Sequence, residues 1–454
     1  MGWIVKARHG AKRFLKWHGE AIVYRVAGLP VLIGGLVSRS EATAAGELRA
    51  LYLRHYFDPD LGNEWFDMAM ALLLWPLVLF GGMALFTARN GRAIAARSGR
   101  SVPLQLWDQL RLYCRHGYLA PWYYIFSLHD AELRSAGPGF LQRFETKRCV
   151  YQRLARRLRP TTPLSDKDAF ARHCAAHGLA ATPTLLMAGG GSAAPALPER
   201  DLFVKPFRGN GGKGAQRWDW LSDGRYRRAD GLILDSAGLA AHLAAISEGE
   251  AHIVQPRLRN HPAIADLSNG ALQTVRALTC LDEHGEPELI GAVFRMGIGA
   301  NGTVDNFHAG GIVSAIDPAT GTLGPATDLG TSARIGWLDA HPDSGATIAG
   351  RALPLWRDVA ELAIAAHRAF ADRILIGWDI GITPEGVRLV EGNYAPDLDI
   401  MQRPQRRGLA DSRLAELLAF HLLGRPTERS SESKHKSVDC RQKAALPDQS
   451  PLAI

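Results

Sequence analysis

Cysteine is scarce in this sequence, with five among 454 residues. Their number is odd, they are scattered along the chain, and no two of them form a C-x-x-C pair. Neither a disulfide framework nor a zinc knuckle is therefore indicated. We expect the chain to work in a reducing compartment. Its length and ordinary composition predict two to four folded domains.

Two common catalytic signatures are also missing. The sequence has no nucleophile elbow and no convincing set of serine, histidine and aspartate, so a protein nucleophile is not indicated. The nucleoside-triphosphate loop G-x-x-x-x-G-K-[ST] is absent, although residues 209–214, GNGGKG, come close to it. Phe207 stands where its first glycine belongs, and Gly214 where its magnesium-binding hydroxyl belongs.

The glycine-rich residues 209–214 still suit an anion. Glycines let successive backbone N–H groups converge on a phosphate, and Lys213 adds a mobile positive charge. A flexible hairpin tip would have the same composition. The residues alone leave both interpretations open.

Acidic residues are few in the first third of the chain. Residues 1–150 contain 19 Lys and Arg against 11 Asp and Glu, whereas the remainder contains 34 of each. A nucleic-acid enzyme should carry its positive charge around the working groove. Here the basic excess coincides with the most apolar part of the chain. This pairing indicates an anionic membrane surface as a partner and argues against nucleic acid.

Charged side chains are missing altogether from residues 68–87, MAMALLLWPLVLFGGMALFT. As a helix this stretch would be about 30 Å long, the thickness of a bilayer core, and we expect a membrane segment. Arginines follow it, which places the remainder on the cytoplasmic face of the cell (inner) membrane. Residues 21–38 would form a second crossing or lie in the interface. The alternative is a core helix of a soluble domain, kinked at Pro76.

The chain divides into regions of different character. We expect a basic and apolar N-terminal region at 1–105, a helical linker at 106–144, a catalytic unit at 145–200 and 201–425, and a disordered tail at 426–454. From 145 on, helices and strands alternate. The predicted elements are a helix at 166–178, strands at 202–206, 252–256, 273–282 and 288–295, a helix near 353–371, and a hairpin at 375–394.

The hairpin is the most informative piece. Asp379 and Glu391 lie about equally far from its turn at 383–386, so they should face each other on antiparallel strands, with Asn393 on the same face. Buried like charges repel unless a cation compensates them. Oxygen ligands without cysteine or clustered histidine favour Mg²⁺ or Mn²⁺. We therefore predict a metal site at Asp379, Glu391 and Asn393. A solvent-facing edge would not need two such apolar strands.

Four motifs together resemble a known superfamily. They are LFVKP with the glycine loop, TVRALT, DNFHAGG, and GWDIGIT followed by EGN. The chain resembles ATP-grasp proteins over residues 145–425, and among them the sugar-transfer-associated proteins related to α-L-glutamate ligases. The resemblance implies an α+β, ATP-grasp fold in which two α+β subdomains clamp ATP. The N-terminal helical, membrane-associated region has no counterpart in the soluble members.

The resemblance also implies roles for single residues. Lys205 and Lys167 would contact the nucleotide phosphates, although Lys147 competes with Lys167 for this role. Gln255 would lie near the adenine, at a position that is often acidic. The loop that would close over the phosphates consists of Gly209, Asn210, Gly211, Gly212, Lys213 and Gly214.

A second group of residues would serve the reaction. Arg276 and Asn306 would bind the γ-phosphate or an acyl phosphate, and Lys213 would neutralise charge when the loop closes. His308 would be a base or a substrate contact, although a lone loop histidine is more often neither. The acceptor pocket would be lined by Asp397, Asp399 and Gln402, although helix capping explains the two aspartates equally well.

The implied activity is that of an ADP-forming carboxylate–amine ligase that depends on ATP and Mg²⁺ (or Mn²⁺) and forms an acyl phosphate. Such a reaction needs positioning and charge neutralisation more than a protein nucleophile. The substrates would be a small carboxylate and an amine or sugar-linked acceptor, in polysaccharide or glycan modification. The alternatives are phosphoryl transfer to a hydroxyl and a non-catalytic, membrane-docked nucleotide-binding scaffold.

Overall fold

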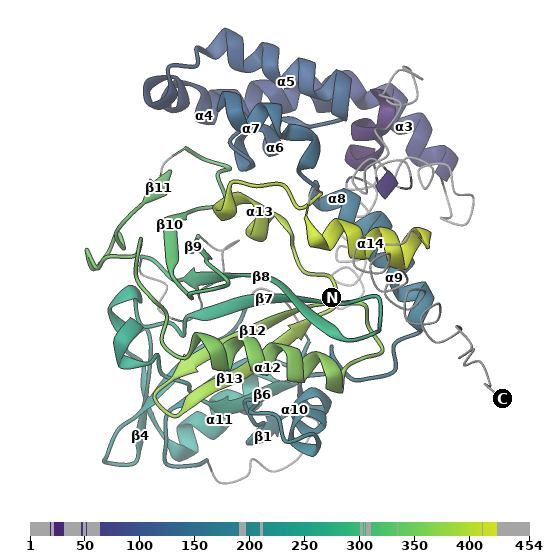
Figure 1. Ribbon diagram of the computed structural model, residues 1–454. Coiled ribbons are helices and arrows are strands. Elements are labelled where there is room, and N and C mark those ends of the chain that lie inside the picture. Colours follow the sequence, from purple (N-terminus) through teal and green to yellow (C-terminus); the bar gives the residue numbers. More distant parts are fainter. Residues whose placement is uncertain are drawn as a thin grey trace, which may run out of the picture.

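The computed structural model describes most of the chain from residue 64 to residue 424. The described residues are 64–189, 197–208, 212–299, 310–333, 335–410 and 412–424, with 22–30 and the positions 19, 47, 48, 51, 303 and 305. They form a helical module and two antiparallel sheets, with the helices stacked above the large sheet in Figure 1. The expected disordered tail at 426–454 lies outside the described residues.

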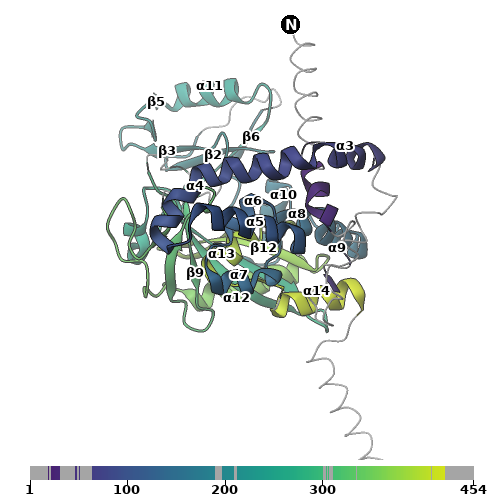
Figure 2. The ribbon, with the colours of Figure 1, turned by 90° about the horizontal axis from the view of Figure 1, so that it is seen from above.

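One helical rod carries the apolar segment predicted at 68–87. It consists of α3 (Glu64–Pro76), a π-helical turn η2 (Leu77–Gly81) and α4 (Gly82–Ser98). Pro76 cannot donate a backbone hydrogen bond to the preceding turn, and the widened π turn follows it directly. Trp65–Ser98 is long and apolar enough to cross a membrane by length and composition, which is weak evidence for a crossing. Figure 2, in which the molecule is seen from above, shows the rod running across the side nearest the viewer.

Short helices connect this rod to the sheets. They are α5 (Val102–His116), α6 (Ala120–Ile125), α7 (Ala131–Ser135), η3 (Gly137–Gly139), α8 (Arg143–Glu145), the π-helical η4 (Thr146–Val150) and α9 (Tyr151–Leu158). Aromatic residues fill the space between them, with Tyr118, Tyr123 and Phe126 almost fully buried. We call residues 64–158 the helical module. Helix α5 of this module spans position 105, so the boundary that the sequence analysis expected after residue 105 falls inside a helix.

The small sheet has six strands in the order β1-β6-β2-β3-β4-β5. Its strands are β1 (Leu186–Ala188), β2 (Leu202–Pro206), β3 (Gln216–Trp220), β4 (Arg225–Arg228), β5 (Ile233–Asp235) and β6 (His252–Pro256). Helix α11 (Ser236–Ile246) covers one face, where Leu202 and Val204 pack against Leu239 and Leu243. Alternation along β2 therefore turns Lys205 to the opposite face.

The large sheet has seven strands in the order β11-β10-β9-β8-β7-β12-β13. Its strands are β7 (Thr274–Leu281), β8 (Pro287–Met296), β9 (Ile312–Ile316), β10 (Leu323–Thr327), β11 (Trp337–Leu338), β12 (Leu375–Thr383) and β13 (Gly386–Asn393). The 3-10 helix η5 (Pro262–Leu267) precedes β7.

Helices cover both faces of the large sheet. Helix α12 (Trp356–Ala369) packs on the face that carries Val275, Ile376 and Trp378. On the other face, Leu278 and Leu375 pack with α9, α13 (Asp399–Gln405) and α14 (Arg413–Leu423). Helix α10 (Lys167–Ala176) begins at the predicted cap, where Asp166 accepts hydrogen bonds from two backbone N–H groups. The predicted strands and helices of the catalytic unit are thus present.

Candidate functional site

The predicted register of the hairpin is confirmed. Strands β12 and β13 pair Asp379 with Glu391 and Gly377 with Asn393, so the three polar side chains share one face of the sheet. Gly377 lies on this face as well. A Cβ atom there would come within 2.7 Å of Pro396 Cβ, and glycine is what lets residue 396 approach the strand.

Two arginines, one on the adjacent strand β7 and one on β8 beyond it, hold the carboxylate of Asp379. Arg276 lies opposite Asp379 on β7 and donates to both of its oxygens, the second at 3.0 Å. Arg295 on β8 donates to Asp379 Oδ2 at 3.0 Å and to Asp305 Oδ1 at 2.6 Å. Thr274 donates to the other oxygen of Asp305 at 2.6 Å. All of these side chains are largely buried, so the charges are poorly screened.

The pKa values of the two acids are shifted in opposite directions. Burial would raise the pKa of Asp379, but Arg276 and Arg295 hold that pKa well below its usual range. Burial and the neighbouring charge of Asp379 raise the pKa of Glu391, against the effect of Lys205. Asp379 is thus ionised, and its negative charge makes ionisation of Glu391 less favourable. A cation added between the two carboxyls would reduce this repulsion.

Two lysines approach these acids from outside the large sheet. Burial lowers the pKa of Lys205, whereas Glu391 and Asp379 raise it. Burial likewise lowers the pKa of Lys167, and Glu391 opposes this effect. Lys167 Nζ also donates to the carbonyl of Pro206, next to Lys205, at 2.7 Å. The small sheet, α10 and the large sheet therefore meet around Glu391.

Lys147 lies in a different group. Its Nζ is 2.6 Å from Asp397 Oδ1, which Arg143 also approaches at 3.2 Å. Of the two lysines that the sequence left in competition, Lys167 is the one beside Lys205.

Two residues of the segment after β13, Asp399 and Gln402, have different surroundings. Asp399 is buried, and its Oδ1 atom has no hydrogen-bond partner among the described residues. Burial and the charge of Asp397 raise the pKa of Asp399 to about 7. Gln402 instead exchanges hydrogen bonds with the backbone N–H and carbonyl of Leu141, at 2.8 and 2.9 Å. The expectation that Gln402 lines an acceptor pocket is therefore wrong, because its amide joins α13 to the helical module.

The glycine loop is described only in part. Gly212 and Gly214 have φ values of 70° and 75°, which favour glycine, and Lys213 is exposed between them. Gln255 is buried on β6, on the face of the small sheet that carries Lys205, and donates to the carbonyl of Thr182 at 3.3 Å. The roles of these residues remain predictions. The sites expected at Gly209, Asn210, Gly211, Asn306 and His308 lie outside the described residues.

Two residues of this site were missed by the sequence analysis. Arg295 and Asp305 belong to the network around Asp379, yet neither was predicted. A signal existed for Arg295, because it is the one charged residue in the apolar run GAVFRM of β8. Within the described parts of the chain, no group of three His, Cys, Asp or Glu residues could hold a metal ion. The predicted metal set has two acids and an amide.

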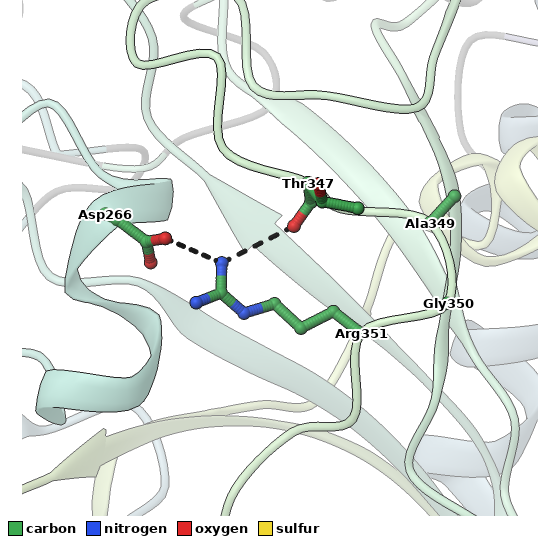
Figure 3. Close-up of a pocket in the computed structure, with 5 residues that line it drawn as sticks. All are labelled: Asp266, Thr347, Ala349, Gly350 and Arg351. Atoms are coloured by element: carbon green, nitrogen blue, oxygen red, sulfur yellow. Dashed lines mark hydrogen bonds and ion pairs between the residues drawn. The ribbon is translucent and has the colours of Figure 1, made fainter.

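A surface pocket lies elsewhere. Its volume is about 420 Å³. Arg351 reaches across it, as Figure 3 shows, and donates to Asp266 and to the carbonyl of Thr347; the two contacts are 2.9 and 3.4 Å long. Ala349 and Gly350 complete its lining. The pocket contains none of the predicted site residues.

Comparison with solved structures returns several amino acid ligases at low identity. The D-alanine-D-alanine ligase from Coxiella burnetii is 12% identical, with a TM-score of 0.30 over 62% of this chain and 61% of that one. The L-amino acid ligase from Bacillus licheniformis is 10% identical, with a TM-score of 0.34 over 59% of this chain and 49% of that one. The chain thus spans less than two thirds of the length of either protein. No curated protein matches the chain in sequence.

The family comparison is more specific. Residues 151–416 match the family described as sugar-transfer associated ATP-grasp. This range contains both sheets and every residue of the network around Asp379. Since the match covers more than half of the 454 residues, the chain belongs to the sugar-transfer associated ATP-grasp family.

Proposed function

We propose that the protein is an ATP-dependent, ADP-forming ligase that joins a carboxylate to an amine or a similar nucleophile. One observation carries the proposal. Lys205 of the small sheet and Arg276 and Arg295 of the large sheet surround one pair of acids, Asp379 and Glu391. Basic groups from two sheets around paired acids suit a nucleotide whose phosphates and metal ion lie between the sheets.

The proposed reaction has two steps. In the first, a substrate carboxylate oxygen attacks the γ-phosphorus of ATP, which forms an acyl phosphate and releases ADP. In the second, the acceptor nitrogen attacks the carbonyl carbon, the bond to phosphate breaks, and the nitrogen loses a proton. Arg276 and Arg295 would stabilise the charge on the transferred group, while Lys205 and Lys167 would orient the phosphates.

The residues present fit a divalent cation. Burial and the charge of Asp379 raise the pKa of Glu391 although Lys205 and Arg276 oppose this, so a further cation would favour the ionised form of Glu391. The amide oxygen of Asn393 is the atom of that side chain that could act as a ligand. Asp379 accepts three hydrogen bonds from arginines, and a carboxylate can accept about four. Asp379, Glu391 and Asn393 would hold Mg²⁺ or Mn²⁺, which would offset charge on the phosphates when bound.

The acceptor and the location are part of the same proposal. The family description names sugar transfer, and we propose that the product belongs to a polysaccharide or glycan. The apolar rod and the basic excess of the first 150 residues support work at a membrane, with the sheets on its cytoplasmic side.

Turnover tests the ligase. The full chain, given ATP, Mg²⁺ and mixtures of carboxylates and amines, should release ADP in a way that requires both substrates. We expect Glu391→Gln to lower the rate by at least about 100-fold. Glu361→Gln is the matched control, since Glu361 is exposed and pairs with the exposed Arg357 on α12. Equal rates for the two variants would refute the site, and a stable phosphorylated product without amine would indicate transfer to a hydroxyl.

Metal binding has a readout of its own. Mn²⁺ titrated into the full chain with ATP should lose its free-ion electron paramagnetic resonance signal as it binds. Glu391→Gln should weaken this binding by about 10- to 100-fold relative to Glu361→Gln. An unchanged titration would exclude Glu391 as a ligand even if turnover were lost.

A further inference from the structure

The outer side of the rod α3–η2–α4 is apolar without interruption. We call its exposed positions from 65 to 85 the apolar face. They are Trp65, Phe66, Ala69, Leu72, Leu73, Pro76, Leu77, Phe80, Gly81, Ala84 and Leu85. Trp65, Leu73 and Leu77 are 89%, 70% and 69% exposed. Monomeric soluble proteins rarely leave such a continuous surface in water.

The inner side of the same rod packs on the protein. Ala71, Leu79 and Met83 lie in one cluster with Tyr113 of α5 and Leu119. Further along, Thr87 accepts a hydrogen bond from Gln109 of α5 at 2.9 Å and from Tyr124 of α6 at 3.1 Å. Figure 2 shows α4 lying along α5 and α6. A helix that crosses a bilayer alone has lipid on every side, whereas this rod has protein along one side.

The exposed charges on α4 and α5 have a single sign. They are Arg89, Arg92, Arg97, Arg111 and Arg115. The acid of these two helices, Asp108, is buried and bound to Arg100 at 2.6 Å. Along α5, the exposed Leu104 and Trp107 precede Arg111 and Arg115 at helical spacing, so apolar and cationic residues form one stripe.

These features favour lipid over a protein partner. A protein interface normally contains about one hydrogen bond per 100–200 Å², but the side chains of the apolar face offer hardly a donor or acceptor. Anionic headgroups complement the arginines, and exposed tryptophans are typical of the membrane–water interface.

We propose that the apolar face lies in the plane of an anionic bilayer, at the boundary of headgroups and acyl chains, with the arginines of α4 and α5 on the lipid phosphates. The rod then does not cross the membrane, and both of its ends stay on the side of the catalytic sheets. This inference rests on the membrane association proposed above and replaces the predicted crossing at 68–87 by contact in the plane.

Vesicle binding tests the surface. The full chain should co-float with vesicles of phosphatidylcholine and phosphatidylglycerol at least about tenfold better than with phosphatidylcholine alone, and added salt should reduce this preference. Leu73→Glu with Leu77→Glu should lower binding by at least about tenfold, and so should Arg89→Gln with Arg92→Gln. The matched control is Leu232→Glu with Ile233→Glu, a pair of exposed apolar residues at β5 that should leave binding unchanged.

The outcomes separate the claims. Loss of vesicle binding in the control variant as well, or equal binding to neutral and anionic vesicles, would refute the proposal that the apolar face binds an anionic membrane. A soluble oligomer that hides the apolar face and binds no vesicles would do the same. Turnover of ATP is measured without vesicles, so failure of the ligase and failure of this surface are distinguishable.

Labelling tests the orientation. Cysteines are placed singly at 64 and 92 in a Cys114→Ser, Cys440→Ser chain, which is added to preformed vesicles and treated with a membrane-impermeant maleimide. Contact in the plane predicts that both positions react from outside. A position 64 that reacts only after the vesicles are ruptured would establish a crossing and overturn the orientation while leaving membrane association intact.

Discussion

Two buried arginines converge on the carboxylate of Asp379. It accepts from Arg276 and Arg295, and Arg295 reaches on to Asp305. Removing one partner of a buried ion pair leaves the other uncompensated, at a cost of about 3–5 kcal/mol. We therefore expect Arg295→Gln to lower the free energy of unfolding by about this amount, as measured by urea denaturation of the full chain.

A double-variant cycle isolates the contact. Asp305→Asn removes the other charge of the 2.6 Å pair while it keeps a group that Thr274 can hydrogen-bond. The two changes together should cost less than the sum of the single changes, by about 0.5–3 kcal/mol. Strict additivity would mean that Arg295 and Asp305 do not interact in solution.

Asp399 makes stability depend on pH. Its pKa in the folded protein is raised to about 7, by burial first and then by Asp397, whereas an unfolded aspartate has a pKa of about 4. The folded state therefore binds the proton more tightly. Its stabilising contribution is complete below about pH 4 and is lost as the pH rises through about 7.

The substitution Asp399→Asn should remove this dependence. The variant should gain stability relative to the natural chain at about pH 8 compared with about pH 5, by up to a few kcal/mol, because asparagine does not ionise on either side of the shift. Melting temperatures of both proteins at the two pH values measure the effect. If the two proteins differed in melting temperature by the same amount at both pH values, the pKa of Asp399 would not be raised.

Among the elements, the β12–β13 hairpin could be predicted best. Its turn residues and period-two alternation are local features, and they were sufficient to place Asp379, Glu391 and Asn393 on one face. The contacts with Arg276 and Arg295 could not be derived in this way. They depend on β7 lying next to β12 in one register, and this pairing joins Asp379 to Arg276, 103 positions earlier in the chain. Strand β8, which follows β7 directly, then brings Arg295 to the same place.

The segment that follows β13 was predicted less well. Asp399 and Gln402 stand close together in the sequence, yet one is a buried acid with a raised pKa and the other joins α13 to Leu141. The difference comes from the helical module, which packs onto α13 from more than 250 positions earlier in the chain. For the apolar rod, sequence reasoning offered a membrane crossing or a buried core helix, and did not foresee a helix with one side covered by α5 and α6 and the other exposed.

Gly377 on strand β12 lies where a larger residue would not fit. A Cβ atom at Gly377 would lie 2.7 Å from Pro396 Cβ and 3.4 Å from Arg276 Cδ. Gly377→Ala should therefore push residue 396 or Arg276 aside and lower ATP turnover by about tenfold or more. Gly324→Ala on β10 is the control, because its nearest atoms are 3.9 Å away. Equal turnover in both variants would show that the approach of Pro396 is not needed.

The molecule as a whole depends on the junction between its helical module and its large sheet. Arg403 of α13 is buried there and donates to the carbonyls of Tyr124 and Ile125 in the module, at 3.1 and 2.6 Å. It also donates to Thr327 Oγ1 at the end of β10, at 3.2 Å. Burial lowers the pKa of Arg403 to about 10, which reflects how little water reaches this cation.

Arg403→Met tests whether this side chain couples the two parts. Methionine keeps an apolar stem like that of arginine but leaves several backbone carbonyls without a donor, so we expect a loss of about 3–5 kcal/mol in unfolding free energy. Arg406→Met is the matched control. Arg406 stands three positions later at the same junction, but its 2.9 Å contact with Asp130 is exposed to water, and surface ion pairs contribute about 1 kcal/mol or less.

In the Arg403 variant, hydrogen exchange should rise in α6 and at the end of β10 while the β12–β13 hairpin stays protected. Similar losses in the two variants, or uniform exchange across the protein, would mean that the module and the sheet are held together by apolar packing instead.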